Sequence, residues 1–328
     1  INMNKYKKIG LTALAGSLVA TSAFAGELGV SGSASMNVEH TNGGAANTGK
    51  TFSMGNSVTF SGSGELDNGM TVSLSFTLDQ GDDTTTQVDA DNKFGGGAPF
   101  DGHSVSISSD ALGKLTLSGE GGKSSTALYD TSAAGDLWDN YDAEDGVEPT
   151  ETGTSDNMLL YTLPSFVDDL SLNVSYEPTG SGTFSAVQYG ASYSGIEGLS
   201  VSFATGEDSN AETDPNETTV LKASYAYGPV TLAYSDYEFD KSGATDGVDM
   251  TAFKVSYTVT DELSIAYASE ELDREDDAEV AEYDEVSVAY TTGGMTIEAS
   301  MGEADNRNGT TAATMDNERW YLGASFAF

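Results

Sequence analysis

Apolar and polar residues alternate with a period of two along most of the chain after residue 27. Leu28, Val30 and Met36 fall on one parity, and Ser31 and Ser35 fall on the other. Successive side chains of a strand point to opposite faces, so each such run predicts a β-strand with one apolar face. The pattern predicts sixteen strands, over 28–38, 52–61, 70–78, 103–109, 114–120, 158–163, 170–177, 185–194, 199–204, 218–227, 230–235, 250–259, 263–268, 284–290, 295–302 and 320–328.

The connections between these runs alternate in length. Seven are short turns, such as 67–69 with its Asp-Asn-Gly hairpin signal, and eight are long loops, of which 121–157 is the longest. Short turns at one end and long loops at the other are typical of outer-membrane barrels. The sequence therefore predicts an all-β fold, a transmembrane antiparallel up-and-down β-barrel of 16 strands.

The last run has the features of a closing strand. Its apolar parity holds Trp320, Leu322, Ala324, Phe326 and Phe328. A strand at an open edge exposes unpaired backbone groups, so we expect this one to pair with 28–38 and close the barrel. Trp320, Phe326 and Phe328 are the residues that we assign to closure and assembly.

Composition agrees with a barrel in a membrane. The chain has no Cys, 38 Gly and 16 Tyr, and no later stretch is apolar enough for a transmembrane helix. Tyrosines near strand ends on the apolar parity suit the aromatic girdles of a membrane interface. They are Tyr161, Tyr176, Tyr189, Tyr193, Tyr225, Tyr227, Tyr234, Tyr257, Tyr267 and Tyr290. Halophilic soluble proteins share part of this composition, which is Gly-rich, Cys-free and strongly acidic.

The first 25 residues resemble a secretory signal. Lys5, Lys7 and Lys8 precede an apolar run over 9–19, and Ala-Phe-Ala at 23–25 supplies a cleavage pattern. Ile1 and Asn2 precede the expected initiator Met and are interpreted as a remnant. We therefore expect residues 1–25 to be removed on export and 26–328 to form a single barrel domain.

The formal net charge of −39 limits the partners. Binding of nucleic acid needs Lys and Arg against the phosphates, so nucleic acid is excluded. The same charge argues against an anion-selective site.

One segment carries a family resemblance. Residues 157–166 read Asn-Met-Leu-Leu-Tyr-Thr-Leu-Pro-Ser-Phe, and together with the repeated Ser-Tyr hairpins and Phe328 they resemble the Gram-negative general-diffusion porins. The resemblance implies a trimeric sixteen-stranded barrel in the outer membrane, with its third loop folded into the lumen against a basic wall. It also implies that the insertion machinery recognises Phe328. Met158, Leu160 and Glu120 depart from the family, because basic residues are common at these positions.

The third loop, 121–157, is the candidate constriction, with 126–145 as its inward part. Loops of this length are usually functional or disordered, and carboxylates in a narrow pore favour cations. The candidate constriction residues are Asp130, Asp136, Trp138, Asp139, Asp142, Glu144 and Asp145. Glu148 and Glu151 could equally belong to a solvated external loop. The candidate wall residues are Glu120, Lys222, Lys254, Glu285 and Glu298, with Arg319 at a rim and Glu65 and Glu177 on the same parity.

Other motifs do not indicate chemistry. Residues 44–51 match a phosphate-binding loop, but a strand follows where that motif needs a helix, so we reject nucleotide binding. The acidic runs 89–93 and 273–277 lack the calcium-loop register, although weak external binding of Ca²⁺ or Mg²⁺ is compatible with them. With His40 and His103 as the only histidines and no Cys, we expect no enzyme activity, metal site or cofactor.

The sequence favours a passive, cation-preferring channel for small hydrophilic solutes. The alternatives are a plugged barrel acting as an adhesin or structural protein through its acidic loops, and a secreted acidic β protein. The expected partners are two further copies of the chain, outer-membrane lipid and lipopolysaccharide, the assembly machinery, and the solutes and cations that pass. Gly32, Ala34, Gly62 and Gly64, small residues on the outward parity, indicate where copies would touch.

Overall fold

A computed structural model describes residues 28–43, 49–79, 102–141, 149, 152–153, 156–178, 184–209, 215–242, 247–275, 277–312 and 315–328. Residues 1–25 and the acidic run 89–93 lie outside the described residues. So do Asp142, Glu144, Asp145 and Glu151, and the phosphate-loop match up to residue 48. The predictions that fall on these residues remain predictions.

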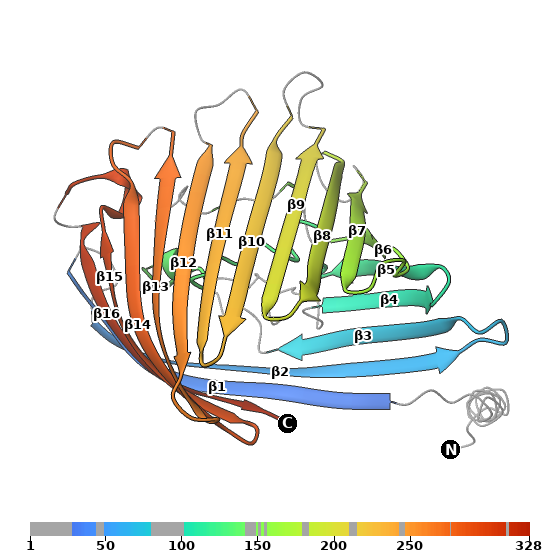
Figure 1. The fold of residues 1–328 in the computed structure, drawn as a ribbon, viewed down its shortest axis with the longest axis horizontal. Helices are drawn as coiled ribbons and strands as arrows, with labels where there is room; N and C mark the ends of the chain where they lie inside the picture. The colour runs from blue at the N-terminus through green and yellow to red at the C-terminus, as the bar shows by residue number, and fades with distance from the viewer. Residues whose placement is uncertain are drawn as a thin grey trace, which may run out of the picture.

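Sixteen antiparallel strands form one closed barrel in which each strand pairs with its neighbours in sequence (Figure 1). β1 also pairs with β16, with Ala34 opposite Phe326 and His40 opposite Trp320, so the predicted fold and closure are confirmed. The strands are β1 (Leu28–Gly43), β2 (Gly49–Glu65), β3 (Thr71–Asp79), β4 (Gly102–Ser109), β5 (Gly113–Glu120), β6 (Met158–Thr162), β7 (Leu170–Glu177), β8 (Ala186–Ile196), β9 (Leu199–Asp208), β10 (Glu217–Tyr227), β11 (Val230–Asp240), β12 (Val248–Thr258), β13 (Leu263–Arg274), β14 (Ala281–Thr292), β15 (Met295–Asp305) and β16 (Asn317–Ala327).

The outer face of the barrel is apolar, as the alternation predicts. Phe52 is 85% exposed, Tyr227 is 76% exposed, and nine of the ten expected girdle tyrosines are exposed large side chains. The tenth, Tyr161, is half-buried and donates its hydroxyl to the carbonyl of Leu112 at 2.7 Å. The inward parity of β1 to β4 carries mainly Ser and Thr, so water-facing and lipid-facing residues alternate as a transmembrane barrel requires.

Several strands extend further on the long-loop side than the sequence predicts. β13 continues to Arg274 and β14 begins at Ala281, where a loop over 269–283 was expected. The alternation inverts at these ends. The inward positions become apolar, as at Leu272 and Met250, and the outward positions become acidic, as at Asp273. The prediction followed the apolar outer face, so it ended each strand where this inversion begins.

Closure between β1 and β16 involves the end of the sequence. The backbone N–H of Gly32 donates to the carbonyl of Phe328 at 2.7 Å, and the N–H of Phe328 donates to the carbonyl of Gly32 at 3.0 Å. A Cβ at Gly32 would lie 2.5 Å from the Phe328 ring. The small residue at position 32 therefore makes room for Phe328 of the same chain, which explains it without a second subunit.

Directly opposed carboxylates form an outward belt at the long-loop ends of β9 to β16. Like charges that face each other across two strands are destabilising. The pairs are Glu207 with Glu217, Glu217 with Asp240, Glu238 with Asp249, Asp249 with Asp273, Glu271 with Glu282, Glu282 with Asp305, Asp284 with Glu303, and Glu303 with Glu318. The belt stores repulsion that salt should screen.

We therefore expect the barrel to withstand higher temperatures as salt increases. Each opposed pair costs roughly 0.2–1 kcal/mol at low salt, and raising the ionic strength shortens the reach of the repulsion. The measurement is the temperature at which the folded band of an unboiled detergent gel disappears, at low and high NaCl. Glu282→Gln, which removes a charge facing two others, should gain stability mainly at low salt. An unfolding temperature that does not change with salt would contradict this account.

Candidate functional site

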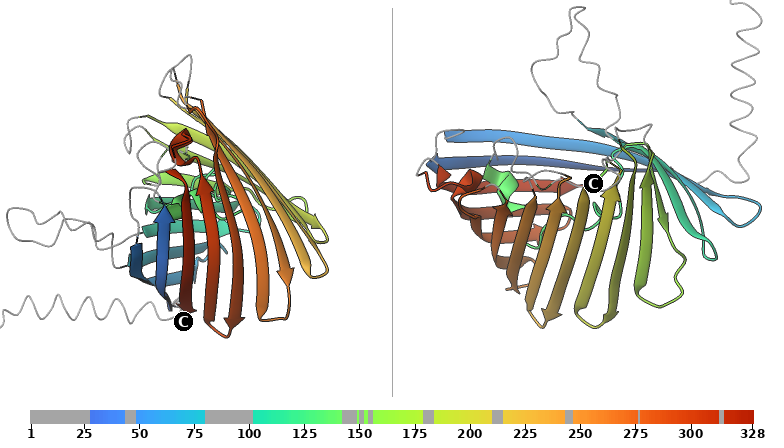
Figure 2. Two further views of the ribbon diagram at one scale, coloured as in Figure 1. Left: turned by 90° about the vertical axis from the view of Figure 1, so that its left-hand side faces the viewer. Right: turned by 90° about the horizontal axis from the view of Figure 1, so that it is seen from above.

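An apolar cluster lies on the inner side of the barrel, at the long-loop ends of β9 to β15. Phe239, Met250 and Tyr283 point inward and are buried. They pack with Leu137 and Tyr141 of η1 (Leu137–Tyr141), a 3₁₀ helix in the third loop. Inward apolar residues would otherwise face the water of the lumen, so burying them under the loop is favourable. In Figure 2, η1 lies on the inner side of the strands that it contacts, β13 and β14.

Glu270 of β13 is the central polar anchor of the loop. Its side chain is fully buried, one oxygen accepts the Ser132 hydroxyl at 2.5 Å, and the other accepts the backbone N–H of Trp138 at 2.9 Å. The Ser132 hydroxyl also accepts the backbone N–H of Asp136 at 2.9 Å, which closes the turn before η1. Glu270 is not among the predicted site residues, because it lies in the extension of β13 beyond residue 268. Continuing the inward parity of Ala266 and Ala268 would have found it.

Further anchors come from β7, β10 and β11. The N–H of Ala133 donates to the Ser235 hydroxyl at 2.7 Å, and the N–H of Ser125 donates to the Ser175 hydroxyl at 2.9 Å. Lys222 donates to the carbonyl of Thr131. Lys222 thus lies on an inward position of β10 and is bound to the loop.

The later part of the loop is anchored to β8 and β10. The fully buried Gln188 donates to the carbonyl of Thr152 at 2.6 Å, and the N–H of Thr152 donates to the Thr218 hydroxyl at 3.0 Å. A Cβ at Gly153 would lie 2.7 Å from a Glu177 carboxylate oxygen. Glu177, expected on the open lumen face, is therefore covered, with 1% exposure.

The structure brings together three of the predicted constriction and wall residues: Asp130, Asp136 and Lys222. Burial raises the pKa of Asp136, and the neighbouring charge of Asp130 raises it further, while the N–H of Ser132 and the Lys222 ammonium lower it. Asp139 is exposed, and Trp138 is half-buried with its indole nitrogen covered. Glu120, Lys254, Glu285 and Glu298 lie on inward positions of β5, β12, β14 and β15.

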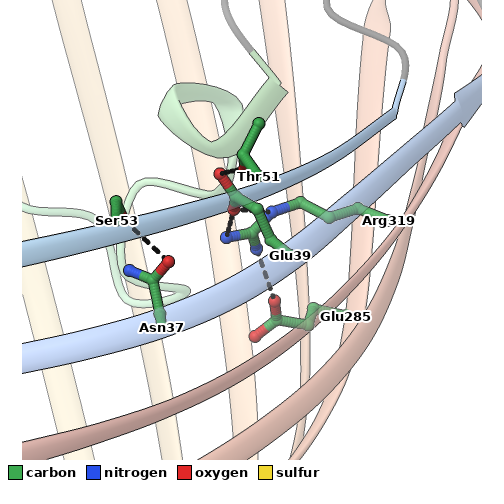
Figure 3. Close-up of polar contacts among 6 residues, drawn as sticks. All are labelled: Asn37, Glu39, Thr51, Ser53, Glu285 and Arg319. Atoms are coloured by element: carbon green, nitrogen blue, oxygen red, sulfur yellow. Dashed lines mark hydrogen bonds and ion pairs between the residues drawn. The ribbon is translucent and has the colours of Figure 1, made fainter.

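Arg319 is the third residue of β16, near the long-loop end of the strand, and its side chain lies on the inner wall. Its side chain is 8% exposed. Its guanidinium nitrogens lie 2.7 Å from a carboxylate oxygen of Glu39 and 3.8 Å from a carboxylate oxygen of Glu285 (Figure 3). Thr51 donates to Glu39 at 3.3 Å on the same wall. One base between two carboxylates leaves this part of the wall with a net negative charge. Nothing in the sequence pattern indicated Glu39, because it lies in the extension of β1 beyond residue 38.

The wall across the barrel from the loop is rich in hydroxyls. The loop is anchored on β7 to β14, and β1 to β4 lie about half-way around the barrel from that region. Ser33 and Ser57 are hydrogen-bonded at 2.8 Å, and Thr59 and Thr77 at 2.9 Å. Within the described residues, the inward positions of β1 to β4 carry no Lys or Arg. The implied basic wall is therefore absent from these strands.

In the part of the chain that the structure describes, no helix is long and apolar enough to cross a membrane. A closed barrel with an apolar outer face and a polar inner wall is the architecture of a transmembrane β-barrel channel.

The amino-acid sequence of this barrel matches a known family. The profile described as "Gram-negative porin" matches residues 10–328, and the chain belongs to that family. No curated protein sequence matches the chain as a relative.

Solved porins have the same fold at low sequence identity. An anion-selective porin from Comamonas acidovorans has a TM-score of 0.69 at 14% identity, over 92% of this chain and 100% of that one. A loop-deletion mutant of OmpT, an outer membrane protein of Vibrio cholerae, has a TM-score of 0.66 at 14% identity, over 93% and 100%. A mutant porin of Rhodopseudomonas blastica has a TM-score of 0.64 at 15% identity, over 92% and 100%. Family and fold together imply an outer-membrane channel, and the Gram-negative porins are a family of non-enzymatic channels.

Proposed function

We propose that the protein is a passive diffusion channel for small hydrophilic solutes and ions, and that it prefers cations. The observation that carries the preference is the asymmetry of charge around the lumen. Asp130, Asp136 and Asp139 lie on a loop that packs against the inner wall, and we infer that this loop narrows the pore. Across from it the hydroxyl-rich strands offer no base to attract anions. Carboxylates in such a throat raise the local concentration of cations.

Two of the bases that face inward add little positive field. Arg319 is held between Glu39 and Glu285, and Lys222 is bonded to the loop carbonyl of Thr131. The Comamonas porin, described as anion-selective, has the same fold at 14% identity. A cation preference in this chain would therefore have to come from its own side chains, because the same fold also serves an anion-selective porin.

Removing the loop acids tests the proposal. We expect Asp130→Asn, Asp136→Asn and Asp139→Asn together to reduce the cation-to-anion permeability ratio several-fold, because attraction within a pore depends exponentially on local charge. The measurement is the reversal potential in a KCl gradient across a planar bilayer. Asp305→Asn, which removes an outward-facing acid, is the matched control and should leave the ratio unchanged. A triple variant with the wild-type ratio would remove the loop from the explanation.

One observation favours the alternative of a plugged barrel. The described part of the loop is anchored at Ser125, Ser132 and Thr152, and it covers an apolar inner cluster. A lumen filled in this way would leave the acidic external loops to act as an adhesive or structural surface. Conductance steps in planar bilayers support the channel, and their consistent absence supports the plugged barrel.

We further propose a homotrimer with lipid and lipopolysaccharide around it, assembled by the machinery that recognises Phe328. Met36, Phe52, Met54 and Leu322 form an apolar outward groove beside Ala34, which supports this face as the subunit contact. Crosslinking of Ala34→Cys should give covalent subunit pairs, and deletion of Phe328 should lower the trimer yield.

The described residues contain no group of acidic and His side chains suited to a metal, so any Ca²⁺ or Mg²⁺ would bind loosely at the outward acids.

A further inference from the structure

Arg307 is an unusually buried charge for an external loop. It begins η2 (Arg307–Gly309), a short 3₁₀ helix between β15 and β16, and is only 2% exposed. Burying a guanidinium is costly unless its donors find partners. The partner of the Arg307 guanidinium therefore shows which part of the protein the loop between β15 and β16 holds in place.

The guanidinium of Arg307 donates to the backbone carbonyl of Tyr141, the last residue of η1 in the third loop. Carbonyls at the end of a helix have no partner within the helix and carry partial negative charge, so a cation there is favourable. The Tyr141 ring packs against Tyr283 with ring centroids 5.7 Å apart. A Cβ at Gly302 would lie 2.6 Å from the Tyr141 hydroxyl. Arg307 therefore holds the end of η1 against β14 and β15.

The other side of η2 is tied to the preceding external loop. The backbone N–H groups of Ala278 and Glu279 donate to the carbonyl of Gly309 at 3.1 and 3.2 Å. Gly309 has a φ of +62°, and Asp277 packs so closely on it that a Cβ would overlap the Asp277 side chain. Residues 277–279 and 307–309 thus form one unit, here called the outer arm.

We infer that the outer arm positions the third loop, and that Arg307 is a positioning residue for the pore. Only the expected effect of Arg307 on conductance rests on the proposed channel function. Glu270 fixes the start of η1 and Arg307 fixes its end, so the two anchors together set the orientation of the helix. The arm couples the outer surface to the constriction, and displacing it from outside changes the pore.

The two tryptophans of the chain make the test direct. Trp138 lies in η1, and Trp320 can be replaced by Phe to leave Trp138 as the only reporter. In this background we compare acrylamide quenching of Trp138 with Arg307 intact, Arg307→Met and Arg307→Lys. A hydrogen bond to a charged group changes a local equilibrium by about tenfold or more. Arg307→Met should therefore raise the quenching slope, and Arg307→Lys, which keeps a charged donor, should restore most of the protection.

Two further variants keep the test decisive. Lys241→Met removes a base from another external loop and should leave the slope unchanged. Gly309→Ala disrupts the arm without touching Arg307, and should raise the slope even if Arg307→Met fails to fold. A wild-type slope in both Arg307→Met and Gly309→Ala would overturn the inference. So would an equal rise in Lys241→Met, or a rise that Arg307→Lys does not reduce.

Bilayer recordings separate this inference from the proposed function. Wild-type protein should give one main conductance step, and Arg307→Met should give several levels. If the wild type gives no steps, the channel proposal fails while the quenching result still decides the role of Arg307. If the wild type conducts and Arg307→Met gives the same single level, the effect on the pore is refuted and the channel proposal stands.

Discussion

Glu270→Ala should release the start of η1 from the wall and destroy the single conductance level of the channel. The substitution removes both acceptors for the Ser132 hydroxyl and the Trp138 N–H, in a region without exposure to water. Leaving a buried donor unpaired costs roughly 1–3 kcal/mol, and two donors are affected. The barrel should persist, because the hydrogen bonds between its strands are unchanged. Planar-bilayer recording should show several levels and frequent transitions where the wild type shows one.

Two variants separate loop release from loss of charge. Glu270→Gln keeps an oxygen that can accept the Trp138 N–H, so we expect a milder effect than with Ala. Glu298→Ala removes an exposed inward carboxylate of β15 and should alter selectivity without adding conductance levels. If Glu270→Ala keeps one stable level in a correctly folded barrel, the loop is held by its apolar contacts and Glu270 is not its anchor.

Arg319→Met is expected to destabilise the barrel and increase its cation preference. Arg319 of β16 donates two hydrogen bonds to Glu39 of β1, so the pair joins the first and last strands (Figure 3). Losing hydrogen bonds between charged groups costs roughly 1.5–3 kcal/mol. The variant also leaves Glu39 and Glu285 uncompensated on the lumen wall, which makes the pore more negative.

The two effects of Arg319→Met are measured separately. Unfolding in detergent reports stability, and the reversal potential reports selectivity. Adding Glu39→Gln should recover part of the stability and return the selectivity towards the wild type, because it removes the uncompensated charge. A shift of Arg319→Met towards anions would contradict the assignment of Glu39 and Glu285 to the lumen.

The barrel could be predicted from sequence because its determinant is local. One face of each strand meets lipid, so runs such as Leu28 to Val38 alternate strictly, and the loop lengths then give the topology. The closing pair was predicted for the same reason, since Trp320 to Phe328 repeats that alternation. The limits of the strands were underestimated where the lipid contact ends, as in β13 and β14, because the alternation inverts there.

The constriction could be predicted only as a segment. Length and acidity identify 121–157, but its contacts join residues more than a hundred positions apart, as in Ser132 with Glu270 and Tyr141 with Arg307. No local period encodes such pairs. Leu137 packs on the wall, whereas Leu128 is 40% exposed. Which loop side chains face the wall depends on the folded turn around Asp136, which has a φ of +57°.

The central claim is that the acidic loop and the base-free wall opposite it make a cation-preferring pore. Its most direct test is the reversal potential of the purified wild-type protein in a planar bilayer with a KCl gradient. We expect a potential of the sign given by K⁺ passing more readily than Cl⁻, reduced by the triple loop substitution. A potential of the opposite sign, as for an anion-selective channel, would contradict the account.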